Sequence, residues 1–361
     1  MYNRSETKTV RVGNILIGGD NPISVQSMTN VPAGDYENSI KQIMQLEKAG
    51  CDIVRLAVPK AEYAEVFTLA KKAGVMCPLV ADIHFDYKIA VECTKHDVDK
   101  IRINPGNIGE KWKVREVVEA CKDKGIPIRI GVNSGSLSKE LLDKYSHPCA
   151  EALAESALSE AECLEDCGFS DIVISIKSSN VAEMIKASSI VRGNSHYPIH
   201  LGVTEAGDDY SGLVKNSIGI GSLLIDGIGD TIRVSLTADP IEEVRAGIEI
   251  LSAIGMNKRG RVNVISCPTC GRTKINLIGL VKEYKKRIVE IDTHGKHLNV
   301  ALMGCVVNGP GEAKEADFGI AGGDGFYMFF KDGQPIKRLD ENEALDFLID
   351  ETKKALGEKK N

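Results

Sequence analysis

Three cysteines in the last third of the chain have the spacing of thiolate ligands. Cys267 and Cys270 form a Cys-x-x-Cys pair within SCPTCGR, and Cys305 follows within MGCVVNGPGE. Both segments are rich in Gly and Pro, which favour the turns that present thiolates to a metal or an iron–sulfur cluster. Three thiolates leave one coordination position open or filled by a weaker ligand, which is typical of a catalytic centre. We therefore expect an enzyme that performs redox chemistry.

Three kinds of site compete for this cysteine pattern. A redox-active dithiol needs only Cys267 and Cys270 and leaves Cys305 without a role. Zinc requires a fourth ligand, and the available His294 and His297 precede a predicted strand instead of lying in a turn. An iron–sulfur cluster is favoured, with Glu312 as a displaceable oxygen ligand beyond a Pro-Gly turn. The other seven of the ten cysteines are interpreted as small buried hydrophobic residues.

A second set of reactive side chains lies at the carboxyl ends of predicted parallel strands. Residues two apart on a strand share a face, so several of these side chains point the same way. In barrel enzymes, that end of the strands carries the active site. The set comprises Arg55, Asp82, His84, Arg102, Asn104, Arg129, Asn133, Lys177, His200, Thr204, Glu205, Arg233 and Ser235.

The four arginines and one lysine of this set predict an anion site. Converging cations repel one another unless an anion lies between them, and guanidinium groups bind phosphate in a bidentate manner, so we expect a small substrate with two phosphates. The alternative is a network of structural ion pairs. For Asp82 and His84, orienting the substrate or the arginines is favoured over metal binding. Glu205, in a loop after a strand, either exchanges protons or holds an arginine.

The elements that must position these residues alternate between strands and helices. Helices that end in Gly introduce several of the strands, and this alternation predicts parallel strands joined by helical crossovers. Eight such units without a dinucleotide-binding glycine motif favour a (β/α)8 TIM-type barrel. The predicted strands are Ile23–Gln26, Ile53–Leu56, Pro78–Ile83, Lys100–Ile103, Pro127–Val132, Asp171–Ile176, Pro198–Val203 and Thr231–Leu236.

A smaller α+β domain is predicted after the barrel. A helix beginning at Asp239-Pro240 is followed by a Gly- and Arg-rich stretch, which we interpret as a linker. The predicted domains are residues 1–258 for substrate binding and 259–361 for the cluster. The second contains a strand from Val262, a helix over Leu277–Ile288, strands at Leu298–Leu302 and Phe318–Ala321, a hairpin around Asp332-Gly333 and a last helix from about Glu341 to Leu356.

Charge and hydropathy exclude several classes of function. The net charge of −6 gives no general surface for nucleic acid, so any anion site must be local. We expect no membrane association, because no apolar run is long enough to span a bilayer. Ten cysteines without a secretory segment indicate a reducing compartment, and we expect the protein to be cytoplasmic.

Long segments of the chain resemble bacterial 4-hydroxy-3-methylbut-2-enyl diphosphate synthase. The similarity covers nearly the whole chain, at the length of the compact two-domain bacterial form. One departure is the loop at residues 208–217, where relatives often have Gly and Lys-Ser. Besides both cysteine segments, the similar stretches are residues 25–30 (VQSMTN), 78–85 (PLVADIHF), 100–107 (KIRINPGN), 201–207 (LGVTEAG) and 227–236 (GIGDTIRVSL).

The resemblance implies an activity and a set of functional residues. The reaction is the reductive ring opening of 2-C-methyl-D-erythritol 2,4-cyclodiphosphate, with loss of water, in the non-mevalonate pathway of isoprenoid biosynthesis. A 4Fe–4S cluster would be bound by Cys267, Cys270, Cys305 and Glu312. Glu205 is the predicted proton donor. The implied substrate-binding residues are Arg55, Asp82, His84, Arg102, Asn104, Arg129, Asn133, Lys177, Thr204, Arg233 and Ser235.

The resemblance also implies partners. Members of this family are homodimers in which the cluster domain of one subunit covers the barrel mouth of the other. Their electrons come from a flavodoxin or a ferredoxin. Two other classes remain open from the residues alone: a phosphate-binding barrel with a zinc-stapled tail, acting as a sensor or scaffold, and a non-reductive barrel transferase that leaves the cysteines without a task.

Overall fold

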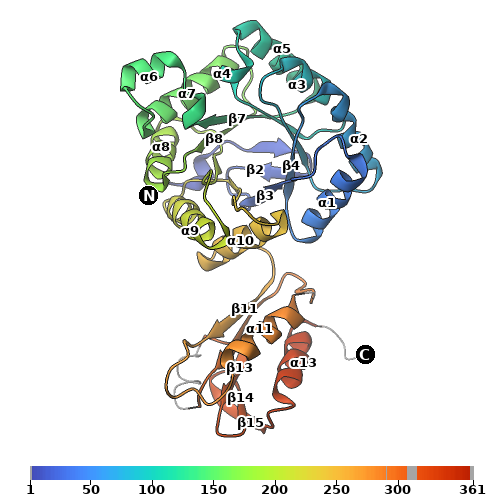
Figure 1. The fold of residues 1–361 in the computed structure, drawn as a ribbon, viewed down its shortest axis with the longest axis vertical. Helices are drawn as coiled ribbons and strands as arrows, with labels where there is room; N and C mark the ends of the chain where they lie inside the picture. Colours follow the sequence, from blue (N-terminus) through green and yellow to red (C-terminus); the bar gives the residue numbers. More distant parts are fainter. Residues whose placement is uncertain (1, 290, 307–314, 358–361) are drawn as a thin grey trace. The chain divides into compact units, whose positions relative to one another are not determined.

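The chain folds into two compact units. The computed structural model describes residues 2–289, 291–306 and 315–357. The units are Met1–Asn257 and Lys258–Asn361, so the division lies one residue before the predicted domain boundary. Each unit has its own sheet, as Figure 1 shows, and buried hydrophobic residues form a separate core in each.

The larger unit is a barrel of eight parallel strands. The strands are hydrogen-bonded in the order β8-β7-β6-β5-β4-β3-β10-β9, and an isolated bridge between Ile174 and Ile199 connects the two ends of this series. The predicted (β/α)8 fold is therefore confirmed. The strands are β3 (Ser24–Met28), β4 (Ile53–Ala57), β5 (Leu79–Asp82), β6 (Lys100–Ile103), β7 (Ile128–Asn133), β8 (Ile172–Lys177), β9 (His200–Leu201) and β10 (Thr231–Ile232).

Helices surround the barrel strands (Figure 1). Several begin at a side chain that accepts a hydrogen bond from the first turn, as Asp35, Asn180 and Asp239 do. The α-helices are α1 (Tyr36–Lys48), α2 (Glu65–Lys72), α3 (Tyr87–Cys93), α4 (Pro105–Ile108), α5 (Lys111–Lys124), α6 (Lys139–Tyr145), α7 (Ala150–Glu165), α8 (Val181–Asn194), α9 (Asp209–Ile225) and α10 (Pro240–Ala253), and short 3-10 turns lie at Arg4–Glu6, Ala61–Ala64 and Ser134–Ser136.

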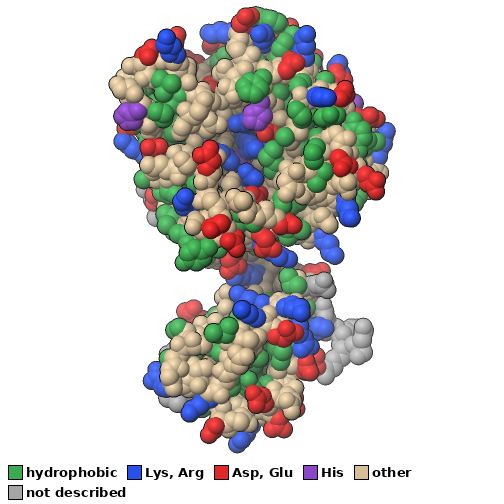
Figure 2. Space-filling model, in the orientation of Figure 1, with side chains coloured by type: hydrophobic (Ala, Val, Ile, Leu, Met, Phe, Trp, Pro, Cys, Tyr) green, Lys and Arg blue, Asp and Glu red, His purple; other side chains and the backbone are tan. Residues whose placement is uncertain are grey.

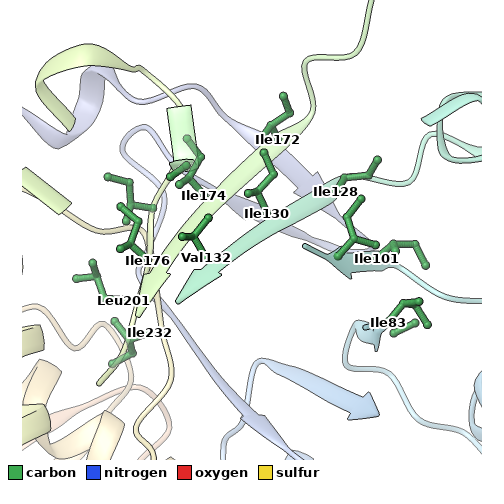
Figure 3. Packing of buried hydrophobic residues seen from close by; sticks show 14 of the residues in the cluster. Ile83, Ile101, Ile128, Ile130, Val132, Ile172, Ile174, Ile176, Leu201 and Ile232 are labelled. Atoms are coloured by element: carbon green, nitrogen blue, oxygen red, sulfur yellow. The ribbon is translucent and has the colours of Figure 1, made fainter. Parts of the chain in front are cut away.

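Strand alternation separates the hydrophobic core from the barrel interior. Figure 3 shows the buried side chains Ile128, Ile130 and Val132 of β7 beside Ile172 and Ile174 of β8. Burying each such side chain stabilises the fold by about 1.5–3 kcal/mol. Because successive side chains of a strand point to opposite faces, the intervening residues of each strand face the barrel interior. The same alternation that builds the core thus directs polar residues inward.

A hairpin near the amino terminus closes one end of the barrel. It consists of β1 (Val10–Val12) and β2 (Ile15–Ile17), which pair antiparallel. Val12 and Ile17 pack on Ile53 and Val80, which lie in the amino-terminal halves of β4 and β5. The turn between the strands contains Gly13 at φ +56°, where a Cβ would lie 2.6 Å from Asp99 Oδ1. This hairpin was not among the predicted elements.

In its described residues, the smaller unit is a five-stranded mixed sheet with two helices. The strand order is β11-β12-β13-β14-β15; the first three are parallel, and β13, β14 and β15 pair antiparallel. The elements are β11 (Arg261–Ser266), α11 (Leu277–Ile288), β12 (His297–Met303), β13 (Phe318–Gly322), β14 (Tyr327–Lys331), β15 (Gln334–Leu339) and α13 (Ala344–Leu356). Among the described helices of both units, none has the length and apolar composition needed to cross a membrane.

Candidate active site

A polar pocket opens at the carboxyl ends of the barrel strands. Its volume is about 150 Å³. Figure 2 shows Lys and Arg side chains gathered in a hollow at the centre of the barrel face. Eight of the predicted site residues line this pocket together with three others, and the lining is Arg55, His84, Arg102, Arg129, Gly131, Val132, Asn133, Ser175, Lys177, Thr204 and Arg233.

Asp82 holds two of the pocket arginines. Its carboxylate lies 3.4 Å from Arg55 Nη2, 3.2 Å from Arg102 Nη1 and 3.3 Å from His84 Nε2. Burial alone would raise the pKa of Asp82, but Arg55, His84 and Arg102 lower it well below its usual range, so the group is ionised. Arg102 lies across Gly131, where a Cβ would be 2.4 Å from its Nε. Asp82 therefore contacts both arginines, and its role in orienting them stays a prediction.

Glu243 holds a third arginine from outside the strands. Arg233 Nη2 lies 3.0 Å from Glu243 Oε1, and its Nη1 donates to Ser235 Oγ at 3.0 Å. Ser27 Oγ also donates to Glu243, at 2.9 Å. The sequence analysis did not identify Glu243, although a signal was present: this acidic residue lies on the same face of α10 as the buried Gly247, four residues on.

Two further cations of the pocket, Arg129 and Lys177, form no ion pair with a carboxylate in the described structure. Burial lowers the pKa of Arg55 to about 10, against the opposing effect of Asp82. Burial and the neighbouring arginines also lower the pKa of Arg129 and of Lys177 well below their usual ranges. All three nitrogens of the Arg129 guanidinium are buried without a hydrogen-bond partner within the described residues. Such an arrangement favours a bound anion.

Glu205 and Asn104 do not line the pocket, and neither do Asp82, His200 and Ser235 of the predicted set. Glu205 is exposed after β9, with φ +51° in the left-handed region. Asn104 is 1% exposed, and its side chain accepts a hydrogen bond from Asn107 N at the start of α4. The amide nitrogen of Asn104 has no partner in the described part of the chain. Both residues still lie at the carboxyl ends of barrel strands.

The two cysteine segments meet at one edge of the smaller sheet. β11 and β12 are parallel, with Ser266 opposite Leu302, so the residues that follow both strands emerge together. Gly304 N donates to Cys267 Sγ at 3.3 Å. A second hydrogen bond, from Lys274 N to Gly304 O at 2.9 Å, joins the segments again. The structure thus brings the Cys305 turn beside the Cys-x-x-Cys turn.

The thiols themselves are free and accessible. Cys267 and Cys305 are half-buried, and Cys270 is exposed. The backbone and side chain of Arg272 lower the pKa of Cys270, which favours the thiolate that binds metal. Within residues 2–289, 291–306 and 315–357, no three His, Cys, Asp or Glu side chains are grouped so as to hold a metal ion. The fourth predicted ligand, Glu312, lies outside the described residues.

Comparison with known proteins identifies both units. Residues 7–248 match the model of the GcpE TIM-barrel domain, and residues 263–354 match that of the GcpE protein C-terminal domain. A 4-hydroxy-3-methylbut-2-en-1-yl diphosphate synthase (flavodoxin) of Geobacter sulfurreducens is 51% identical over 99% of this chain and 99% of its own. The enzyme of the same name from Clostridium perfringens is 55% identical over 96% of this chain and 98% of its own.

Solved structures resemble the fold at much lower identity. Dihydropteroate synthase from Stenotrophomonas maltophilia has a TM-score of 0.51 and 12% identity, covering 69% of this chain and 98% of its own. Plasmodium falciparum HPPK-DHPS A437G has a TM-score of 0.52 and 14% identity, covering 69% of this chain and 49% of its own. These likenesses show the fold alone. The family matches go further: the chain belongs to the GcpE family, and the predicted family of 4-hydroxy-3-methylbut-2-enyl diphosphate synthases is confirmed.

Proposed function

We propose that the barrel pocket binds 2-C-methyl-D-erythritol 2,4-cyclodiphosphate and that Cys267, Cys270, Cys305 and Glu312 hold a 4Fe–4S cluster. The relatives are named for the synthesis of 4-hydroxy-3-methylbut-2-en-1-yl diphosphate, and the proposed activity is the reductive opening of this ring to that product with loss of water. The observation that carries the proposal is the set of cations in the pocket, of which Arg129 has no hydrogen-bond partner in the described structure.

The pocket cations would stabilise the leaving group. Ring opening breaks a carbon–oxygen bond, and the phosphate oxygen departs with the bonding electrons. Two electrons and one proton then allow the neighbouring hydroxyl to leave as water, so the reaction consumes both. Arg55, Arg102 and Arg233 are held in place by buried carboxylates, and so they present fixed donors to the charge that develops on the oxygen.

The cysteine turns have a suitable donor set for the cluster. Three free thiols lie on two turns joined by the hydrogen bond from Gly304 N to Cys267 Sγ, and the thiolate form of Cys270 is favoured. Backbone N–H groups beside sulfur ligands are a usual feature of iron–sulfur sites. When bound, the cluster supplies electrons one at a time.

Glu205 is the proposed proton donor for the departing water. Its carboxyl group is exposed beyond β9, next in sequence to Thr204, which lines the pocket. A carboxyl group at this rim can deliver a proton to a substrate held by the cations below.

An anaerobic assay tests the proposal directly. Protein purified without oxygen should be brown and contain iron and sulfide. With the cyclic diphosphate and a chemical reductant it should form the open-chain diphosphate, identified by mass spectrometry. Colourless protein with stoichiometric zinc and no turnover would refute it and favour the non-redox sensor or scaffold.

The proposal includes a flavodoxin as electron donor and an active site shared by two copies of the chain. The relatives carry the word flavodoxin in their names. A mixture of Arg129→Met and Cys305→Ala chains tests the sharing. If each site combines the pocket of one copy with the cysteines of another, random dimers should regain about a quarter of the wild-type activity. If pocket and cysteines act within one chain, the mixture stays inactive.

A further inference from the structure

A second layer of polar side chains lies inside the barrel, beneath the pocket. Lys100 is two residues before Arg102 on β6 and pairs in register with Val80, which packs on the hairpin that closes the barrel. His200 opens β9 and pairs with Thr231. Barrel interiors are usually filled by bulky aliphatic residues. Here the buried residues include Lys100, the mutually registered Ser24, Thr231 and His200, and Gln26, two residues after Ser24 on β3.

The polar atoms of this layer are unsatisfied. Lys100 and His200 are both 0% exposed. Neither the Lys100 ammonium nitrogen nor either His200 ring nitrogen has a hydrogen-bond partner among the described residues. Asp99, the carboxylate next to Lys100, instead pairs with Lys71 at 3.0 Å. The two buried carboxylates at the pocket, Asp82 and Glu243, are paired with arginines. Among the described residues, Lys100 and His200 therefore form no ion pair with a carboxylate.

The surroundings of Lys100 and His200 disfavour the charged form of both groups. Burial lowers the pKa of Lys100 well below its usual range, and Arg129 and Arg55 lower it further, with only Asp99 opposing. The pKa of His200 is lowered in the same way, first by burial and then by Arg129, Lys177, Lys100 and Arg55. A neutral amine or imidazole has a lone pair that can accept a hydrogen bond. Both groups are thus suited to face the Arg129 guanidinium, which is a donor only.

A bound diphosphate reverses this electrostatic balance. Its negative charges would lie among the pocket cations, one layer above Lys100. Charges separated by low-dielectric protein interact more strongly than in water, so the anion favours the protonated form of a nearby base. Lys100 has the higher intrinsic basicity of the two groups.

We propose that Lys100 is a positioning residue of the anion pocket: buried without a partner among the described residues, one layer below Arg129, it takes up a proton when a diphosphate binds above. The inference rests on the proposed function in taking a diphosphate as the ligand. It links substrate binding to proton uptake at a residue outside the pocket lining, in a reaction that itself consumes a proton.

Calorimetry with inorganic pyrophosphate measures this proton. Binding to the full-length protein is titrated at one pH in two buffers of different ionisation enthalpy, which gives the number of protons taken up. The wild type should take up about one proton more than Lys100→Met, because only the lysine can titrate. Lys124→Met, at the exposed end of α5, is the matched control and should keep the wild-type number.

Measurements on further variants distinguish the ways in which the proposal could fail. His200→Gln should keep the wild-type proton number if Lys100 is the acceptor. Pyrophosphate binding by Lys100→Met with an unchanged proton number would overturn the proposal, as would loss of uptake in His200→Gln alone. If Lys100→Met does not fold, Lys100→Gln gives the same comparison. Failure of the wild type to bind pyrophosphate would contradict the anion pocket itself, and with it the proposed function.

Discussion

The barrel pocket and the cysteine turns both lie at the ends of parallel strands, but they differ in how many contacts fix their functional side chains. Both follow the carboxyl ends of parallel strands, β3–β10 in the barrel and β11 and β12 in the smaller sheet. At the pocket, the side chain of Asp82 is 1% exposed and contacts Arg55, Arg102 and His84. At the cysteine turns, Cys270 is exposed and the described residues hold no grouped metal ligands.

This difference reflects the chemistry of the two ligands. Arg55, Arg102 and Arg233 are paired with buried carboxylates, so the protein orients these three guanidinium groups before the substrate arrives. Thiolates repel one another, and a metal that binds them supplies part of the folding energy of its own site. The protein therefore orients these three pocket cations itself, whereas the proposed cluster would supply part of the order of the cysteine turns. The predictions below test this distinction.

Cys305→Ala should have the largest effect, and on one region only. Removing a thiolate ligand should abolish the cluster, so turnover falls by more than about 1000-fold. The pocket should still bind pyrophosphate with wild-type affinity. Iron and sulfide content, activity and calorimetry measure the three quantities. Loss of anion binding in this variant would show that the two regions are not independent.

Glu205→Gln should reduce turnover while leaving both regions assembled. A proton donor typically contributes about 100- to 10,000-fold to the rate, and the amide cannot donate a proton in the same way. Because Glu205 is exposed and does not line the pocket, iron content and pyrophosphate affinity should stay unchanged. Undiminished kcat with a normal cluster would remove Glu205 from the proposed role.

The sequence predicted the barrel well where strand alternation is strong. The predicted bounds of Lys100–Ile103 are those of β6, and α11 also has its predicted bounds. The last two barrel strands are shorter than predicted. Asn216 of α9 accepts a hydrogen bond from Val203 N and donates one to Ser235 O, so a side chain takes the place of strand pairing there. A buried asparagine on a helix leaves no periodic signal.

The candidate site was predicted less completely than the fold. Charged residues at strand ends indicated the pocket lining, because their position follows from topology. Glu243 was missed because it approaches from a helix, and its role depends on contact with Arg233. Lys100 was visible two residues before Arg102, but sequence alone gives no reason to bury an unpaired lysine. Tertiary packing decides both cases.

Asp82→Asn should test whether the pocket is organised in advance. Removing one partner of a buried ion pair costs about 3–5 kcal/mol, because the arginines remain buried without their carboxylate. The single tryptophan, Trp112 on α5, reports unfolding of the barrel unit in denaturant. Added pyrophosphate should recover part of the loss. Cys270→Ser is the control at the other region and should leave the Trp112 transition unchanged; equal stability of Asp82→Asn and wild type would contradict a preorganised pocket.

The smallest expected effect is the pH dependence that His200 gives to the barrel. Its pKa is lowered in the folded state, first by burial and then by Arg129, so below about pH 6.5 the unfolded chain binds a proton that the folded chain does not. Stability from this residue is therefore present above that pH and lost on acidification, by at most about 1.4 kcal/mol per pH unit. In anion-free buffer, the free energy of unfolding of His200→Gln and of the wild type is measured from Trp112 and plotted against pH. Above pH 7 the two plots should run parallel, because any proton binding by Lys100 is common to both proteins. Below pH 6.5 they should diverge, with the wild type losing more stability. Curves that stay parallel to pH 5 would mean that His200 is protonated inside the barrel, and the interior would then hold a counter-ion as the pocket does.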